Sequence, residues 1–520
     1  MNNIDPKIII DSVKELKDNF NKATPHDEIL KQLKEQIKPI DFQKVAFPQI
    51  EELRKKSIEL EKVLKLPDGS FNKDKSLDNE RDEWKVINRK LESFKINQKH
   101  YLVLSIDHLL EFAKEKRWGL CKNHDFIYLY NGNYWASLDK EEFQKFLGET
   151  SKKMGVPKFS AKHFQFREHL QKQFLSTAYL PTPQTDNNKV LINLMNGTFE
   201  ISPQKTILRA FNSKDFITYQ LPFNYDPEAR APIFQKYLDE VLPDIERQKV
   251  LAEYLGFVFM KHGNKTLKEE KALVLYGSGA NGKSVFYEVV NALLGEENTS
   301  NYSLSSITDE KGYHRAKLAN KLVNYASEIN GKLEASVFKQ LVSGEPVEAR
   351  LPYGQPFTLK NYAKLIFNSN ELPKEVEHTN AFFRRFLIIP FDVTIPPEKR
   401  DSNLHNKIID TELSGVFNWV LDGLNRLLEQ KRFSKCDAAQ KAVDNYRIES
   451  DSSQMFMDES GYKVSAVNEI SLDNLYSEYA NYCNNSGYKA CGKRSFSSRL
   501  VNAGYQKTRK GYGMAINAEK

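Results

Sequence analysis

The stretch Leu273-Val-Leu-Tyr276, Gly277-Ser-Gly-Ala-Asn-Gly282-Lys283-Ser284 decides the fold of this 520-residue chain. An apolar, strand-like run leads into a loop of the pattern G-x-x-x-x-G-K-S, and the spacing of apolar residues over 283–294 predicts a helix after it. In that setting glycines let backbone N–H groups turn towards phosphates, and the helix N-terminus adds the positive end of its dipole. We therefore expect a nucleotide site; a chance glycine-rich turn is the alternative.

The role of each loop residue follows from this pattern. Lys283 would reach the β- and γ-phosphates of ATP, and the Ser284 hydroxyl would bind Mg²⁺. The residues expected to surround the phosphates are Gly277, Ser278, Gly279, Ala280, Asn281, Gly282, Lys283 and Ser284.

Three more short apolar segments follow, over residues 321–325, 363–367 and 386–390, and they alternate with helical patterns. This alternation predicts a parallel α/β sheet. Hydrolysis needs a carboxylate near the γ-phosphate, and Glu328 after the first segment is the candidate general base and second metal ligand. An amide of Asn368-Ser-Asn370 after the second segment would orient water, and the Arg384-Arg385 pair before the third suits an arginine finger in trans. A surface Glu, a simple Asn turn and a solvated Arg pair are the alternatives.

Taken together and in this order, these segments resemble a superfamily 3 helicase of the phage, plasmid and poxvirus primase-helicase type. The likeness includes Phe338-Lys339 through Val347-Glu-Ala-Arg350, Phe367-Asn-Ser-Asn370-Glu-Leu-Pro373 and Phe383-Arg-Arg385-Phe, and it covers about residues 100–520. Within this group the chain looks most like the replication initiator helicases (Rep) of staphylococcal pathogenicity islands. The resemblance implies an ATP-dependent helicase or initiator that forms a hexameric ring on DNA.

The resemblance also assigns roles to single positions. It identifies Gly277–Ser284 as the Walker A loop and Glu328 as the end of the Walker B strand, with Ser327 where many relatives carry a second acid. It places Asn370 at the sensor position and Arg385 at the finger, with Arg384 as the alternative. Lys339 stands where the family has a basic residue, with an expected role at the subunit interface.

The family implies a DNA-contacting hairpin before the sensor strand, and residues 347–360 fit one. Apolar and charged residues alternate up to a turn at Tyr353-Gly354 and then return. Tyr353 at the tip would stack on single-stranded DNA, while Arg350 and Lys360 supply charge. An ordinary surface hairpin is the alternative.

A basic segment over residues 493–510 contains six cations and no acid: Lys493, Arg494, Arg499, Lys507, Arg509 and Lys510. Its pattern predicts a helix, with Phe496, Leu500 and Val501 facing inward, followed by two strands around Lys510-Gly511. A helix and a basic wing are typical of a winged helix that binds duplex DNA. A solvated basic face is the alternative.

Composition limits the remaining classes. Lys and Arg number 76 against 69 Asp and Glu, and this net charge of +7 permits a nucleic-acid partner without requiring one. The four cysteines form no C-x-x-C pair, which argues against a disulfide framework or a cysteine zinc site and favours a reducing compartment. No apolar run approaches the ~20 residues of a membrane span, and no secretory signal is visible. We therefore expect a cytoplasmic protein, in a bacterial host according to the resemblance, with no membrane partner.

The predicted fold class is α/β multidomain: a P-loop, AAA+-like parallel-sheet ATPase core with a helical N-terminal region and a C-terminal winged helix. Residues 68–83 read as a polar linker within the N-terminal region. The expected divisions are a helical N-terminal region (1–95), a pre-helicase α+β domain (100–250), the ATPase domain (251–400), a helical linker or lid (401–455) and a winged-helix domain (456–520).

Three functions remain open at this level. The leading one is an ATP-driven helicase that replicates a phage, plasmid or pathogenicity island. The others are a different ring ATPase, such as a packaging motor or helicase loader, and an origin-binding initiator that uses ATP as an assembly switch. The first 100 residues carry no Asp-x-Asp pair on a strand, so no primer synthesis is expected. These residues would form an oligomerising collar or bind a separate primase or host replication factor.

Overall fold

The computed structural model describes residues 12, 24–123, 126–178, 189–202, 205–262, 267–327, 329, 333–352, 354–373, 376–486, 488 and 490–520. Glu328 and Tyr353, both singled out above, lie outside these residues. The chain divides into two compact units. One contains residues 19–185 and 210–219, and the other contains residues 186–209 and 220–520.

The first unit is mainly helical and carries one small antiparallel sheet. Its core is formed by apolar residues such as Leu33, Ile106, Leu129, Phe143 and Phe174, all 0–1% exposed. The helices are α2 (His26–Gln36), α3 (Phe42–Ala46), α4 (Ile50–Leu64), α5 (Asp78–Ser93), α6 (Gln98–Glu115), α7 (Lys140–Met154), α8 (Lys158–Lys162) and α9 (Phe164–Thr177). The sheet has the order β1 (Gly119–Asn123), β2 (Phe126–Tyr130), β3 (Trp135–Ser137).

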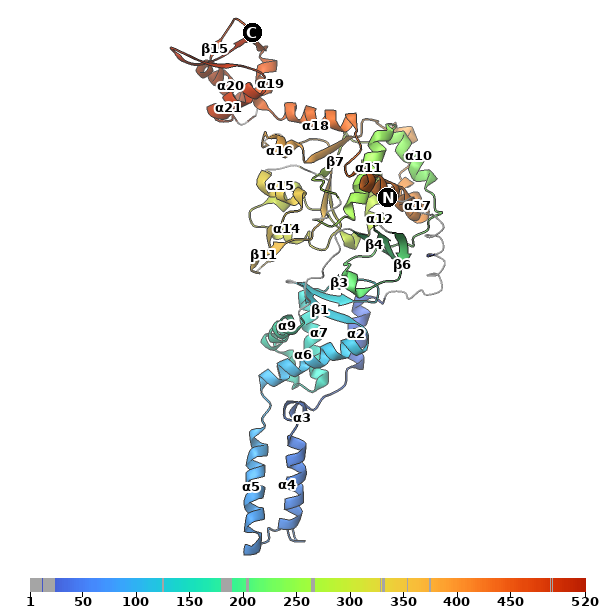
Figure 1. The fold of residues 1–520 in the computed structure, drawn as a ribbon, viewed down its shortest axis with the longest axis vertical. Helices are drawn as coiled ribbons and strands as arrows, with labels where there is room; N and C mark the ends of the chain where they lie inside the picture. The colour runs from blue at the N-terminus through green and yellow to red at the C-terminus, as the bar shows by residue number, and fades with distance from the viewer. Residues whose placement is uncertain are drawn as a thin grey trace. The chain divides into compact units, whose positions relative to one another are not determined.

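Two expectations for this unit can be compared with the structure. The Asn131-Gly132 pair between two apolar runs predicts a hairpin, and this is confirmed, since Tyr130 pairs with Trp135 across the turn. The linker expected over residues 68–83 is wrong in its second half, where α5 begins at Asp78. Ser57 of α4 donates to Asn88 of α5 at 3.1 Å, and Figure 1 shows α4 and α5 as a neighbouring antiparallel pair. Packing against α4 therefore stabilises a helix in a charged stretch whose composition is typical of a linker.

The second unit contains a five-stranded parallel sheet in the order β13-β7-β12-β9-β8. The strands are β7 (Ala272–Tyr276), β8 (Thr299–Ser300), β9 (Val323–Ala326), β12 (Lys364–Ser369) and β13 (Phe386–Pro390). The predicted parallel α/β sheet is therefore confirmed. Because all strands point the same way, their carboxyl ends lie along one edge, where open α/β sheets bind ligands.

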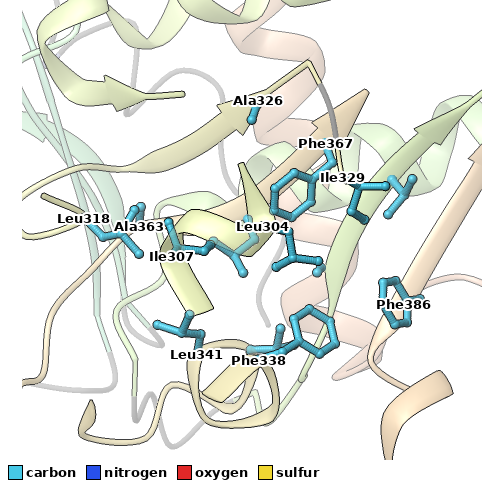
Figure 2. Close-up of a cluster of buried hydrophobic side chains, with 14 of the residues drawn as sticks. Leu304, Ile307, Leu318, Ala326, Ile329, Phe338, Leu341, Ala363, Phe367 and Phe386 are labelled. Carbon is cyan, nitrogen blue, oxygen red and sulfur yellow. The ribbon is translucent and has the colours of Figure 1, made fainter. Parts of the chain in front are cut away.

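Helices and apolar side chains cover the sheet on both sides. Val274, Phe367 and Ile388 pack with Phe338 of α15 (Ala335–Ser343) and Tyr446 of α18 (Asp437–Glu449). Figure 2 shows the middle of this cluster, with Phe338, Phe367 and Phe386 among the labelled rings. Leu273 and Leu275 alternate with Val274, so they face the opposite side, and both are 0% exposed.

Helix α17 (Leu404–Gln430) packs against both α11 (Ile245–Val258) and α12 (Lys283–Leu294). The contact between α11 and α17 requires glycine on both helices. A Cβ at Gly256 would lie 2.6 Å from the Leu424 side chain, and one at Gly423 would lie 2.3 Å from the Ala252 backbone. The spacing of apolar residues predicts helix over residues 233–260. The structure has two helices there, because α10 (Pro232–Val241) ends before Pro243 and α11 begins after its N-cap Asp244.

Smaller elements complete this unit. A second antiparallel sheet has the order β4 (Val190–Leu194), β5 (Gly197–Ile201), β6 (Thr206–Arg209). The Asn196-Gly197 pair predicts a hairpin between the first two strands, and this hairpin is confirmed and gains a third strand. The remaining elements before residue 450 are α13 (Leu304–Thr308), α14 (Tyr313–Ala316), β10 (Val347–Arg350), β11 (Pro356–Leu359) and α16 (Asn380–Phe383).

The last segment has its own apolar core, which includes Phe456, Leu475, Tyr479, Phe496 and Ile516. Its helices are α19 (Ser452–Glu459), α20 (Leu472–Ser486) and α21 (Lys493–Asn502). A sheet of order β15 (Ile470–Ser471), β17 (Gly513–Ile516), β16 (Lys507–Lys510) and the pair β14 (Lys463–Val464) with β18 (Ala518–Glu519) complete it. Of the residues expected to face inward on α21, Phe496 and Leu500 are buried, whereas Val501 is 46% exposed because no other element covers it.

Candidate nucleotide-binding site

The glycine-rich loop joins β7 to α12 at the carboxyl edge of the parallel sheet. The N–H of Gly277 donates to Ser369 O of β12 at 3.1 Å, and the amide of Asn281 donates to Phe391 O after β13 at 3.0 Å. The Tyr237 hydroxyl of α10 donates to Gly282 O at 2.8 Å. The loop is therefore held in shape by three other elements, a role for Tyr237 that no sequence pattern indicates.

Two features of the loop require glycine. Gly279 and Gly282 have φ of +98° and +87°, which disfavours residues with a Cβ. A Cβ at Gly277 would lie 2.5 Å from Phe391 O. The turns at Gly279 and Gly282 fit a loop that aims consecutive N–H groups at an anion in front of the α12 N-terminus. Ser278 and Ala280 are exposed at the loop surface.

Lys283 and Asn370 meet in this structure although 87 residues separate them. Lys283 Nζ donates to Asn370 Oδ1 at 3.2 Å and to Gly277 O at 2.5 Å. Lys283 is only 7% exposed, and this burial lowers the pKa of its ammonium group. The two are brought together because β12, which ends just before Asn370, is the strand next to β7. An amine and an amide thus point at the volume in front of the loop.

An oxygen donor for a hard cation, the Ser284 hydroxyl, is present at the same place. Ser284 is the second residue of α12 and is exposed, so its hydroxyl suits Mg²⁺, which prefers oxygen ligands and keeps several waters. Strand β9, which precedes Glu328, ends at Ala326 and is separated from β7 by β12 alone. Two strand spacings put the end of β9 about 10 Å from β7.

The two arginines expected near the γ-phosphate differ sharply in environment. Arg385 is 7% exposed, and its guanidinium bonds to Ser343 Oγ at 2.9 Å, to Ala381 O and to Glu270 at 3.1 Å. The Arg384 side chain is 58% exposed and contacts Glu270 at 3.2 Å. Arg385 is thus held by residues of the same chain, while the Arg384 side chain is mostly exposed. Sequence reasoning missed Glu270 and Ser343, because nothing local marks either as an arginine partner.

Lys339, for which the resemblance implies a role at the subunit interface, lies on α15. Its ammonium pairs with Glu377 at 2.8 Å, and both side chains are about one-third exposed. This pair lies within one subunit.

The hairpin expected over residues 347–360 is confirmed. Strands β10 and β11 pair antiparallel, with Val347 opposite Leu359 and Arg350 opposite Pro356. Val347, Ala349 and Leu359 are buried, and Arg350 and Lys360 are exposed. Arg350 Nε donates to Gly354 O at 2.9 Å, which holds its guanidinium at the turn.

The six cations of the C-terminal segment divide into two sets of three. Acids from outside the segment pair with one set: Asp473 with Lys493, Asp451 with Arg499 at 3.2 Å, and Glu469 with Lys510 at 2.7 Å. The other set is exposed and has no carboxylate partner among the residues that the structure describes: Arg494, Lys507 and Arg509. The local charge is therefore about half of what the sequence suggests.

Comparison with protein families finds two matches. Residues 107–243 match the family described as D5 N terminal like, and residues 275–385 match a family of unknown function, DUF5906. The second range includes the loop, Asn370 and both arginines.

Two viral proteins are similar to this chain. "Putative helicase L207/L206" of Acanthamoeba polyphaga mimivirus is 27% identical over 241 residues, which are 44% of this chain and 24% of that protein. "Putative helicase 121R" of Invertebrate iridescent virus 3 is 22% identical over 348 residues, which are 58% of this chain and 36% of that protein. The chain thus matches about a quarter to a third of the length of these relatives.

Among solved structures, the apo C-terminal region of NrS-1 aligns with 78% of this chain and 97% of its own length, at 14% identity and a TM-score of 0.44. In the described part of the chain, no helix combines the length and apolarity needed to cross a membrane. The D5 N-terminal-like region and the two viral relatives support the helicase family of the primase-helicase type as the group that this chain resembles.

Proposed function

We propose that this chain is an ATP-dependent DNA helicase and replication initiator of a phage, plasmid or pathogenicity island. The observation that carries the proposal is the contact between Lys283 and Asn370 in front of a glycine-rich loop at the carboxyl edge of a parallel sheet. The D5 N-terminal-like match and the helicase names of the viral relatives support the choice of helicase among nucleotide-driven proteins.

Each group at the site has a separate role in ATP binding and hydrolysis. The loop amides and Lys283 would bind and neutralise the β- and γ-phosphates, and Ser284 and Glu328 would hold Mg²⁺, which would offset the negative charge of the phosphates. Glu328 accepts a proton from the attacking water, and Asn370 positions that water. Asn370 lies at the end of β12, between the loop strand β7 and strand β9, which leads towards Glu328. When ATP binds, the hydrogen bond between Lys283 and Asn370 would rearrange. This change would transmit the presence of the γ-phosphate to strand β12.

The AAA+-like ring is the oligomeric form that we propose, with six subunits. Arg384 supplies the finger in trans, since its exposed guanidinium can reach a neighbouring subunit whereas Arg385 is held by Ser343 and Ala381. The hairpin of β10 and β11 would contact single-stranded DNA through Arg350, Tyr353 and Lys360, and ATP hydrolysis around the ring would move it.

The last segment is proposed as a winged helix that binds origin duplex DNA. In its order of elements, α21 precedes the β16–β17 hairpin, as a recognition helix precedes its wing. Exposed Arg494, Lys507 and Arg509 would contact phosphates.

The decisive experiment is displacement of a labelled strand from a forked duplex, dependent on ATP and Mg²⁺. Lys283→Ala should abolish both displacement and ATP hydrolysis, and the matched control Lys55→Ala, at an exposed lysine of α4, should change neither. Glu328→Gln should stop displacement while ATP and DNA still bind. Origin-dependent function that survives Glu328→Gln would instead indicate ATP as an assembly switch, and absence of displacement on every fork would reject the helicase.

A further inference from the structure

Helix α8 and the first residue of α9 present two phenylalanine rings to solvent. Phe159 is 87% exposed and Phe164 is 68% exposed. The surrounding backbone is well packed, since Ala161 between them is 1% exposed and Phe166 just after them is 2% exposed. Their exposure is therefore fixed by the fold. Two large apolar rings held in water are unfavourable for an isolated chain and indicate a binding surface.

The segment that carries these rings is basic. Residues 150–167 contain five lysines and arginines and no acid: Lys152, Lys153, Lys158, Lys162 and Arg167. Among the described residues, no carboxylate lies within ion-pair distance of any of the five. Lys153 and Arg167 instead donate to backbone carbonyls, at 3.0 Å to Lys34 O and at 3.2 Å to Ala161 O.

A groove of about 420 Å³ is lined by four of these five cations, among them Lys162 of α8. Its lining includes Lys152, Lys153, Lys162, Arg167 and Lys34, together with two carboxylates. One of these, Glu149, is already paired with Lys34 at 3.0 Å. The groove therefore keeps an excess of positive charge, in contrast to the C-terminal segment, where acids pair with half of the cations.

Exposed rings and cations alternate along residues 158–164. Lys162 follows Phe159 by one helical turn and lies on the same face of α8, and Lys158 is adjacent in sequence. The His163 ring lies 5.0 Å from the Phe164 ring. Exposed aromatic faces stack on unpaired bases while neighbouring cations contact phosphates, and duplex DNA offers no such free base faces.

We infer that this surface, defined by Phe159, Phe164 and the five cations of residues 150–167, binds single-stranded nucleic acid. The choice of DNA rests on the proposed function, but the surface lies in the compact unit that does not contain the nucleotide loop. It is thus a second strand-binding site, separate from the β10–β11 hairpin and the C-terminal segment.

The test measures binding of a labelled oligothymidylate of about 16 nucleotides to the full chain without nucleotide, by fluorescence anisotropy. The F159A/F164A variant should bind at least about tenfold more weakly. The F159L/F164L variant should be equally weak because leucine keeps the apolar surface but has no aromatic face. The F159W/F164W variant should bind as wild type does, with its tryptophan emission quenched on binding.

Charge variants test the second half of the proposal. K158S/K162S should reduce the slope of log affinity against log salt by about 1.4, which is two single-strand phosphate contacts. The matched control K55S/K62S, at exposed lysines of α4, should leave the slope unchanged. Thermal melting should show that all variants fold.

The proposal fails if F159A/F164A binds the oligonucleotide as wild type does. It also fails if the leucine variant binds as wild type does, which would indicate apolar docking of a protein, or if the wild type binds anionic vesicles and not the oligonucleotide. Because nucleotide is absent, these results do not depend on whether the chain hydrolyses ATP. A chain without helicase activity could still pass this test.

Discussion

Lys364 is a buried cation at the start of β12, at the end of the sheet opposite the nucleotide loop. Its Nζ lies 3.0 Å from His262 Nδ1 and 4.2 Å from the centre of the Phe257 ring. Burial lowers the pKa of Lys364 to about 7, and burial together with the nearby Lys364 lowers the pKa of His262 to about 3. The unfolded chain therefore binds more protons than the folded chain over two ranges of pH.

Stability should consequently fall as pH falls through both ranges. As pH falls from 10 to 7, the unfolded Lys364 takes up a proton while the folded Lys364 stays neutral, which lowers the free energy of unfolding by about 3–4 kcal/mol. Below about pH 6.5 the unfolded His262 becomes protonated while the folded one stays neutral, which adds a second loss. Thermal melting midpoints between pH 5 and 10 measure this. Lys364→Met should flatten the slope above pH 7, and the exposed control Lys360→Met should keep it; equal slopes would contradict the prediction.

Substitutions of the adjacent Arg384 and Arg385 should have different effects, one on ATP hydrolysis and the other on stability. Arg385→Ala removes bonds to Ser343 and Ala381 O from a buried site and should destabilise the chain by about 3 kcal/mol. Arg384→Ala removes an exposed group and should leave the melting midpoint unchanged while lowering ATP hydrolysis by the oligomer at least about a hundredfold. If Arg384→Ala hydrolyses ATP at the wild-type rate, Arg384 is not the finger.

At the scale of elements, α21 and β16 should bind duplex DNA through half of their cations. Replacing Arg494, Lys507 and Arg509 with serine should weaken duplex binding and reduce the salt slope by about 2.7, which is three phosphate contacts. The matched control set is Lys493, Arg499 and Lys510, each of which is already paired with a carboxylate. Serine at these positions should change the salt slope less and lower the melting midpoint more, because Asp451 loses a partner. Equal salt slopes for the two sets would show that ion pairing does not decide which cations bind DNA.

At the scale of the whole molecule, the C-terminal segment should be separable from the sheet that carries the nucleotide loop. Its apolar core is formed by its own residues, including Phe456, Leu475 and Phe496, and the loop is anchored by β12, α10 and the segment after β13. A chain that ends after residue 451 should therefore hydrolyse ATP at the basal rate and lose most of its duplex affinity. Loss of basal hydrolysis with an unchanged melting midpoint would indicate that the segment takes part in the nucleotide site.

The sequence by itself determined the local elements whose causes lie within a few residues. The loop of Gly277–Ser284, the strand before it and the helix after it can be predicted because glycine conformations and apolar periodicity are local properties. The Asn-Gly hairpins and the β10–β11 hairpin were predictable for the same reason. Asn370 could be proposed as a partner of the loop only because it follows the second predicted strand after the loop.

The tertiary structure alone decided which side chains meet and which charges remain free. Insertion of β12 beside β7 brings Asn370 to Lys283, and Glu270 and Ser343 bury Arg385 while Arg384 stays exposed. Acids distant in sequence neutralise half of the C-terminal cations, whereas the cations around Phe159 keep their charge. Sequence patterns cannot give these outcomes, because Coulomb interactions and burial depend on distances through space between residues far apart along the chain.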